Sequence, residues 1–106
     1  MPKYLVQANY VGEGVKGLLK EGGTSRRAAA EALVKSLGGT MEAFYYAFGE
    51  TDAYIIAELP DNASMAALAL TVSTSGAVTV KTTVLMTPEE LDEAAKKTPS
   101  YRPPGQ

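Results

Sequence analysis

Two carboxylates, Glu50 and Asp52, lie two positions apart in the stretch "FGETD", between two apolar runs. A carboxylate pair can serve acid–base chemistry or contribute to a metal site, but an oxygen-ligated cation needs several more converging donors. The Asp-x-Asp-x-Asp spacing of a calcium loop is absent. Because Gly49 gives the backbone freedom and Asp52 can accept hydrogen bonds from nearby backbone N–H groups, we interpret the stretch as a hairpin turn and expect no metal site.

A second candidate site is the segment "GGTSRR", which ends in Arg26 and Arg27. At the start of a helix, free backbone N–H groups, two hydroxyls and two guanidinium groups can bind an anion. On a helical wheel Arg26 lies near the apolar stripe of the same helix, so it can reach over the edge of a sheet. The alternative is that Arg27 pairs with Glu31 one turn later, while Arg26 is solvated or paired with Glu21.

The composition excludes several kinds of chemistry. The 106 residues include neither cysteine nor histidine, so disulfides, thiolate ligands and nucleophile–histidine pairs are impossible, and we expect no cofactor. The net charge of −2 gives no basic surface for nucleic acid or anionic membranes, and we expect neither as a partner. No stretch approaches the ~18 apolar residues of a membrane span, and no signal-peptide pattern is present, so we expect a cytoplasmic protein.

The elements that must position these residues follow from the periodicity of the chain. Alternating residues predict strands over 3–10, 40–48, 52–59 and 77–86. Apolar residues at helical spacing predict helices over 13–21, over 24–37, and from a cap at Asp61 or Asn62 to Gly76. Thr87-Pro88-Glu89-Glu90 predicts a capped C-terminal helix that ends near Lys97.

This order of elements predicts an α+β, ferredoxin-like βαββαβ fold with an extra C-terminal helix. The four strands form an antiparallel sheet, and the helices pack on one of its faces. We expect a single domain over residues 1–97 and a Pro-rich extended tail over 98–106.

Alternation along the strands separates a helix-covered face from an open face. The covered face is expected to carry the smaller, apolar side chains of Val6, Ala8, Met41, Ala43, Tyr45, Ala47, Ile55, Ala57, Leu59, Val78, Val80 and Val84. The open face is expected to carry those of Leu5, Gln7, Asn9, Glu42, Phe44, Tyr46, Phe48, Tyr54, Ile56, Glu58, Thr79, Lys81, Thr83 and Leu85. Large exposed apolar patches mark interfaces, so we expect a homodimer or higher oligomer formed through the open face.

The run "FYYAFGETDAYIIAELPDN", with the opening "MPKYLVQANYVGEGVKGLLKEGG" and the closing "TTVLMTPEELDEAAKK", resembles the GYD-domain family of small bacterial proteins. This resemblance implies a dimeric α/β barrel of ferredoxin-like type, and it implies no particular chemistry. Gly49 and Asp52 match the Gly-Tyr-Asp signature of the family name. Thr51 stands where the tyrosine is expected, and Tyr54 is the candidate replacement.

The leading hypothesis is a homo-oligomeric module that binds a small ligand or acts in regulation, with its site between the open sheet face and the first helix. A small anionic or aromatic ligand would be bound by Gln7, Asn9, Arg26, Tyr46 and Lys81. If the polar groups of the open face only pair with those of a second copy across the interface, the protein is instead a structural assembly protein without a ligand.

A further alternative is a cofactor-independent enzyme, monooxygenase-like or isomerase-like, that acts in the barrel cavity. In such an enzyme Glu58 would be the base, and Tyr46 or Asn9 would hold an oxyanion.

Overall fold

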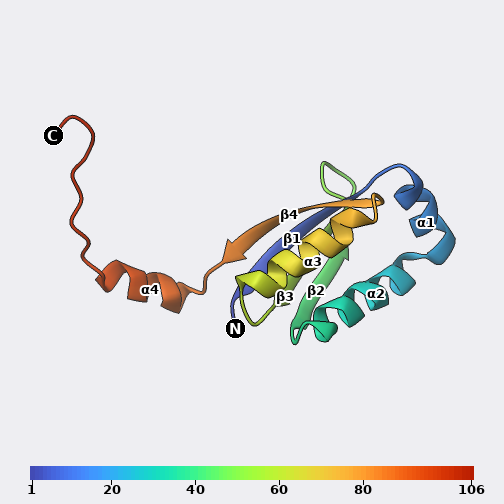
Figure 1. The fold of residues 1–106 in the computed structure, drawn as a ribbon, viewed down its shortest axis with the longest axis horizontal. Helices are drawn as coiled ribbons and strands as arrows, with labels where there is room; N and C mark the ends of the chain where they lie inside the picture. Colours follow the sequence, from blue (N-terminus) through green and yellow to red (C-terminus); the bar gives the residue numbers. More distant parts are fainter.

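A computed structural model describes residues 1–106, and each expected element is present with ends within two residues of those expected. The elements are β1 (Lys3–Tyr10), α1 (Glu13–Glu21), α2 (Gly23–Ser36), β2 (Thr40–Tyr46), β3 (Ala53–Glu58), α3 (Asn62–Thr74), β4 (Val78–Leu85) and α4 (Pro88–Lys96). Figure 1 shows α3 lying across the sheet and α2 running beside it.

The four strands form one sheet in the order β2-β3-β1-β4, and every neighbouring pair is antiparallel. The hairpin joins the neighbouring strands β2 and β3, whereas the helical connections run from β1 to β2 and from β3 to β4, which are not neighbours in the sheet. This arrangement confirms the α+β class and the antiparallel four-stranded sheet, and it is consistent with the ferredoxin-like plan.

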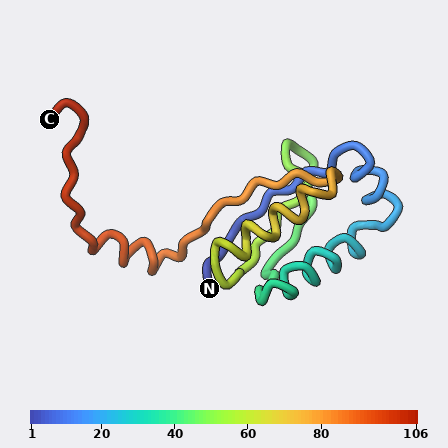
Figure 2. The backbone as a smooth tube through the Cα atoms, viewed as in Figure 1, coloured from blue at the N-terminus to red at the C-terminus, as the bar shows by residue number.

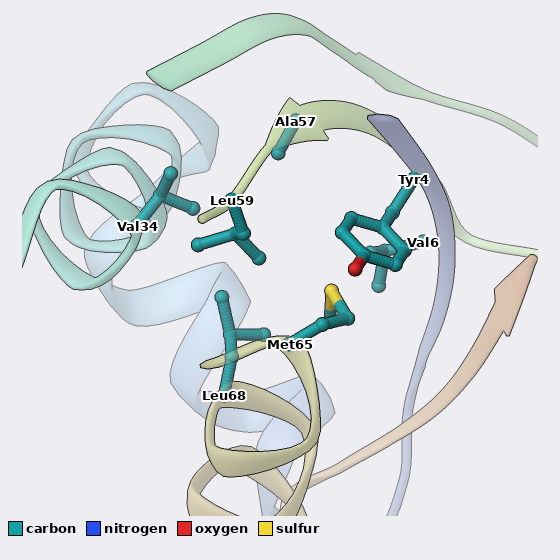
Figure 3. Packing of buried hydrophobic residues seen from close by; sticks show 7 residues of the cluster. All are labelled: Tyr4, Val6, Val34, Ala57, Leu59, Met65 and Leu68. Carbon is teal, nitrogen blue, oxygen red and sulfur yellow. The ribbon is translucent and has the colours of Figure 1, made fainter. Parts of the chain in front are cut away.

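The hydrophobic core lies between this sheet and helices α2 and α3. Its cluster of buried side chains, drawn in Figure 3, consists of Tyr4, Val6, Val34, Ala57, Leu59, Met65 and Leu68. The side chains of Val34 from α2 and Leu68 from α3 point toward Leu59, which follows β3. Two layers of secondary structure are thus held together by a small apolar core.

Local capping sets the ends of the helices. The carboxylate of Asp61 accepts a hydrogen bond from the backbone N–H of Ser64 at 2.8 Å, which caps α3 and lowers the pKa of Asp61. Gly22 lies between α1 and α2 with a φ of 89°, which interrupts the helical backbone. Such a backbone angle strongly favours glycine. The expected capping box of α4 is confirmed, with Thr87 and Glu90 bonded in both directions.

Helix α4 buries no residue against the rest of the chain. Figure 2 shows that α4 and the segment after it project away from the other elements, which gives the molecule a longest extent of 57 Å. No helix in the structure combines the length and the apolar character that crossing a bilayer requires.

Strand β2 contains a β-bulge that the sequence pattern did not reveal. Met41 pairs with Ala57, but the next pair along β3 joins Ala43 to Ile56, so the register shifts between Met41 and Ala43. Because side chains alternate with a period of two, one extra residue exchanges the faces of everything that follows.

The expected faces of β2 are therefore wrong beyond the bulge. Phe44 and Tyr46 lie on the helix-covered face, whereas Ala43 and Tyr45 lie on the open face, and Tyr45 is paired with Tyr54. The faces expected for β1, β3 and β4 agree with the observed registers. Phe48 lies beyond the end of β2 in the hairpin loop and is fully exposed.

Candidate functional site

A cavity of about 110 Å³ lies between the covered face of the sheet and helices α2 and α3. All four strands and both helices contribute to its lining. Many of the residues that face each other across it are alanines: Ala8, Ala29, Ala30, Ala53 and Ala57. Side chains this small leave space that the larger neighbours do not fill, which explains the void.

Arg26 is the only charged residue that lines this cavity. Its side chain is one-third exposed, and one guanidinium nitrogen lies 3.6 Å from a carboxylate oxygen of Glu21. Of the pairings considered for the two arginines, the one with Glu21 is present. Arg27 forms no ion pair with Glu31 or with any other carboxylate.

Tyr46 closes the space between β2 and the start of α2. Its hydroxyl donates a hydrogen bond to the carbonyl oxygen of Gly23 at 3.0 Å. A Cβ atom at Gly23 would lie 2.9 Å from Cε2 of Tyr46, so a larger residue there would displace the ring from its present position. The ring of Tyr46 also packs edge-to-face on Phe44, with the ring centroids 5.0 Å apart.

The phenol of Tyr46 is a neutral hydrogen-bond donor at ordinary pH. Its partial burial, together with hydrogen bonding to Tyr10, raises the pKa of Tyr46 to about 12. Its proton is directed to Gly23. Tyr46 thus connects α2 to the sheet, and its hydroxyl is not free to donate a hydrogen bond to an oxyanion.

A shallower depression adjoins the outer side of Tyr46. Gly23, Thr24, Arg27, Phe44 and Tyr46 line it, and Phe44 also lines the apolar cavity. This depression contains part of the anion-binding segment expected from the sequence, with Arg27 exposed beside it.

Gln7 and Asn9 hold the β2–β3 hairpin loop. The side-chain amide of Gln7 donates a hydrogen bond to the hydroxyl of Thr51 at 3.2 Å, and the side-chain carbonyl of Asn9 accepts one from the backbone N–H of Asp52 at 2.9 Å. The Asp52 carboxylate accepts a bond from the backbone N–H of Tyr10 at 3.0 Å. The interpretation of this stretch as a turn is confirmed, but the expectation that Asp52 accepts from a backbone N–H near it in the chain is wrong, because its partner lies in β1. Thr51 is a buried acceptor within the turn.

Glu58 lies at the other end of the open face, beside Lys3. The Lys3 ammonium lies 2.9 Å from a carboxylate oxygen of Glu42 and 3.8 Å from one of Glu58. Hydrogen bonding between Lys3 and Glu42 raises the pKa of Lys3 and lowers that of Glu42. Lys81 is exposed in β4, paired in register with Gln7, and forms no ion pair.

The residues expected to form one site are divided between two faces. Gln7, Asn9, Glu58 and Lys81 lie on the open face, while Arg26 and Tyr46 lie on the helix side. Within one copy the open face and the helices are on opposite sides of the sheet, so they do not enclose a common site. No group of three or more acidic residues is arranged to hold a metal ion.

The sequence pattern placed Val6, Ala8, Ile55, Ala57, Val78 and Val80 on the helix-covered face, but it did not reveal the cavity that they line. Its signal in the sequence is the pair Ala29 and Ala30 in α2, which line the cavity together with Ala53 and Ala57 of β3. That signal is weak, because alanine is also the most favourable residue for a helix.

Comparison with known proteins identifies one family. The sequence model described as GYD domain matches residues 4–95, so the resemblance inferred from the sequence is confirmed over all four strands and most of α4. Comparison with curated proteins and with solved structures gave no match.

Proposed function

Since the chain belongs to the GYD domain family, we propose that it is a homo-oligomeric module that binds a small ligand or acts in regulation. Two copies pack through their open sheet faces into a dimeric α/β barrel. Each copy holds its ligand in the apolar cavity between its sheet and helices α2 and α3. The observation that carries this proposal is the cavity itself, with a single cationic side chain at its lining.

The unfilled volume supports a binding role because an empty apolar cavity lowers stability. Because the lining residue Ala29 is exposed, the cavity is partly open, and its cost in stability is smaller than that of a sealed void of about 110 Å³. A ligand that occupies the void regains part of this free energy, and it stabilises the folded state by mass action.

The open face supports self-association. Leu5, Ile56 and Leu85 are only half-buried in a single copy, and the bulge adds Tyr45, which is 71% exposed, beside Tyr54. The charged groups at one end of this face are already paired with each other. A second copy therefore covers apolar surface without leaving those charges unpartnered.

The enzyme alternative lacks comparable support. Its expected base, Glu58, lies on the open face, and Tyr46 lies on the helix side with its proton bonded to Gly23. The structural-assembly alternative also predicts an oligomer, but one whose cavity binds nothing, so the second of the two experiments that follow distinguishes it from a ligand-binding module.

The association is tested by light scattering coupled to size-exclusion chromatography. Ile56→Glu adds a charge to the open face and should give a monomer. Leu70→Glu, on the exposed side of α3, should leave the oligomer intact. A monomeric unmodified protein, or equal effects of the two substitutions, would contradict association through this face.

The cavity is tested by thermal shift and calorimetry with toluene as a neutral apolar probe. Ala30→Leu places a larger side chain in the cavity lining and should abolish the toluene-induced shift, whereas Ala28→Leu alters an exposed residue outside it and should not. If the unmodified protein does not bind toluene, or if Ala30→Leu binds it equally well, the proposed site is wrong.

A further inference from the structure

The cavity combines an apolar lining with a single charged residue. Among its lining residues only Arg26 carries a charge, and only Tyr10 carries a hydroxyl. The remaining lining residues are aliphatic or aromatic, with Leu33, Phe44 and Ile55 among the largest. A ligand that matches this lining has a compact apolar part and one polar group directed toward Arg26.

Arg26 is incompletely satisfied by its present partner. Its distance of 3.6 Å from Glu21 is longer than the roughly 2.7–2.9 Å of a charge-assisted hydrogen bond, and the Glu21 side chain is 47% exposed. A guanidinium group has five N–H donors in a fork that matches a carboxylate. Arg26 can therefore donate hydrogen bonds to a second carboxylate, either together with Glu21 or in its place.

The size and charge of the site limit the class of ligand. An apolar cavity of about 150 Å³ in an engineered protein binds benzene, so a volume of about 110 Å³ suits one ring or a short branched chain. One guanidinium balances one negative charge. A phosphate monoester carries nearly two, and the second charge would remain uncompensated beside an apolar wall.

We propose, resting on the proposed function of the same cavity, that its ligand is a small monocarboxylic acid. The aromatic or branched apolar part enters the cavity between α2, α3 and the sheet. The carboxylate pairs with Arg26 at the cavity lining.

The test compares phenylacetate with its neutral isostere phenylacetamide by isothermal titration calorimetry at pH 7. The unmodified protein should bind phenylacetate at least about tenfold more tightly, because hydrogen bonds between two charged partners are stronger than those to a neutral amide. Arg26→Met should make the two affinities equal. Arg26→Lys should keep part of the preference, since it retains the charge and loses the fork.

Two further variants separate a specific pairing from general attraction. Arg27→Met removes a neighbouring cation that does not line the cavity, and it should keep the full preference. Glu21→Gln removes the competing carboxylate and should tighten phenylacetate binding by about twofold or more. Circular dichroism melting of each variant checks that it is folded.

Equal binding of phenylacetate and phenylacetamide by the unmodified protein would overturn this inference, as would an equal loss of preference in Arg27→Met and Arg26→Met. Toluene binding distinguishes the proposed cavity site from the proposed carboxylate preference. If toluene binds but phenylacetate is not preferred over phenylacetamide, this inference is wrong and the cavity site is retained. Failure of toluene to bind contradicts both the proposed cavity site and this inference.

Discussion

The two faces of the sheet are formed by the same four strands, but the side chains on each face have different roles. On the covered face, Tyr4, Val6 and Leu59 are almost fully buried, and the alanines around them leave a void. On the open face, the polar side chains are engaged in holding the structure: Gln7 and Asn9 bind the hairpin loop. Gln7 and Asn9, two of the residues expected to bind a ligand, thus stabilise the hairpin loop, whereas the proposed ligand site lies in the apolar layer.

The largest expected effect tests whether stability resides in the covered face. Leu59→Ala should reduce the free energy of unfolding by about 2–5 kcal/mol, because Leu59 is fully buried and its truncation leaves a new cavity in the core. Urea denaturation at low protein concentration measures this. Leu5→Ala, on the open face, should cost clearly less in a single copy, since Leu5 is only half-buried there. Equal costs under these conditions would break the contrast between the faces.

An intermediate effect tests the hairpin anchor on the open side. Asp52→Ala should reduce the free energy of unfolding by about 1–2 kcal/mol, because it leaves the backbone N–H of Tyr10 without its charged acceptor. Glu50→Ala is the matched control: the Glu50 side chain is exposed and forms no ion pair, so its removal should change stability by less than about 0.5 kcal/mol. If the two substitutions cost the same, the turn does not depend on Asp52.

The smallest effect concerns the ion pair between Lys3 and Glu42. The pKa of Glu42 is lower in the folded state than its usual value of 4.5, so the stabilisation is present above that pH and is lost as the pH falls below it. The difference in melting temperature between the unmodified protein and Glu42→Gln should therefore vanish on acidification, and it should shrink in high salt. Glu31→Gln, whose carboxylate has no ion-pair partner, should show no comparable pH dependence.

Much of the fold could be predicted because its signals are local. Strand β1 follows from alternation over a few residues, and the capping box of α4 from the spacing of Thr87 and Glu90. The hairpin between β2 and β3 also follows from its short turn sequence, Gly49-Glu50-Thr51. Each of these depends on hydrogen bonds or periodicity within a short segment, so the residues that determine it are adjacent in the chain.

The candidate site could not be predicted in the same way. The faces of Phe44 and Tyr46 depend on the bulge between Met41 and Ala43, and nothing in the local pattern marks that extra residue. Arg26 was found from the sequence, but its place beside an apolar cavity was not.

The sequence by itself determined the order of elements, the capped helices, the hairpin and the family of this protein. The tertiary structure alone decided which side chains share a face of β2 and where space is left unfilled. The physical reason is that strand register and packing volume arise between elements far apart in the chain. A shift of one residue in pairing, or a few alanines that meet across a layer, changes them without altering any local preference.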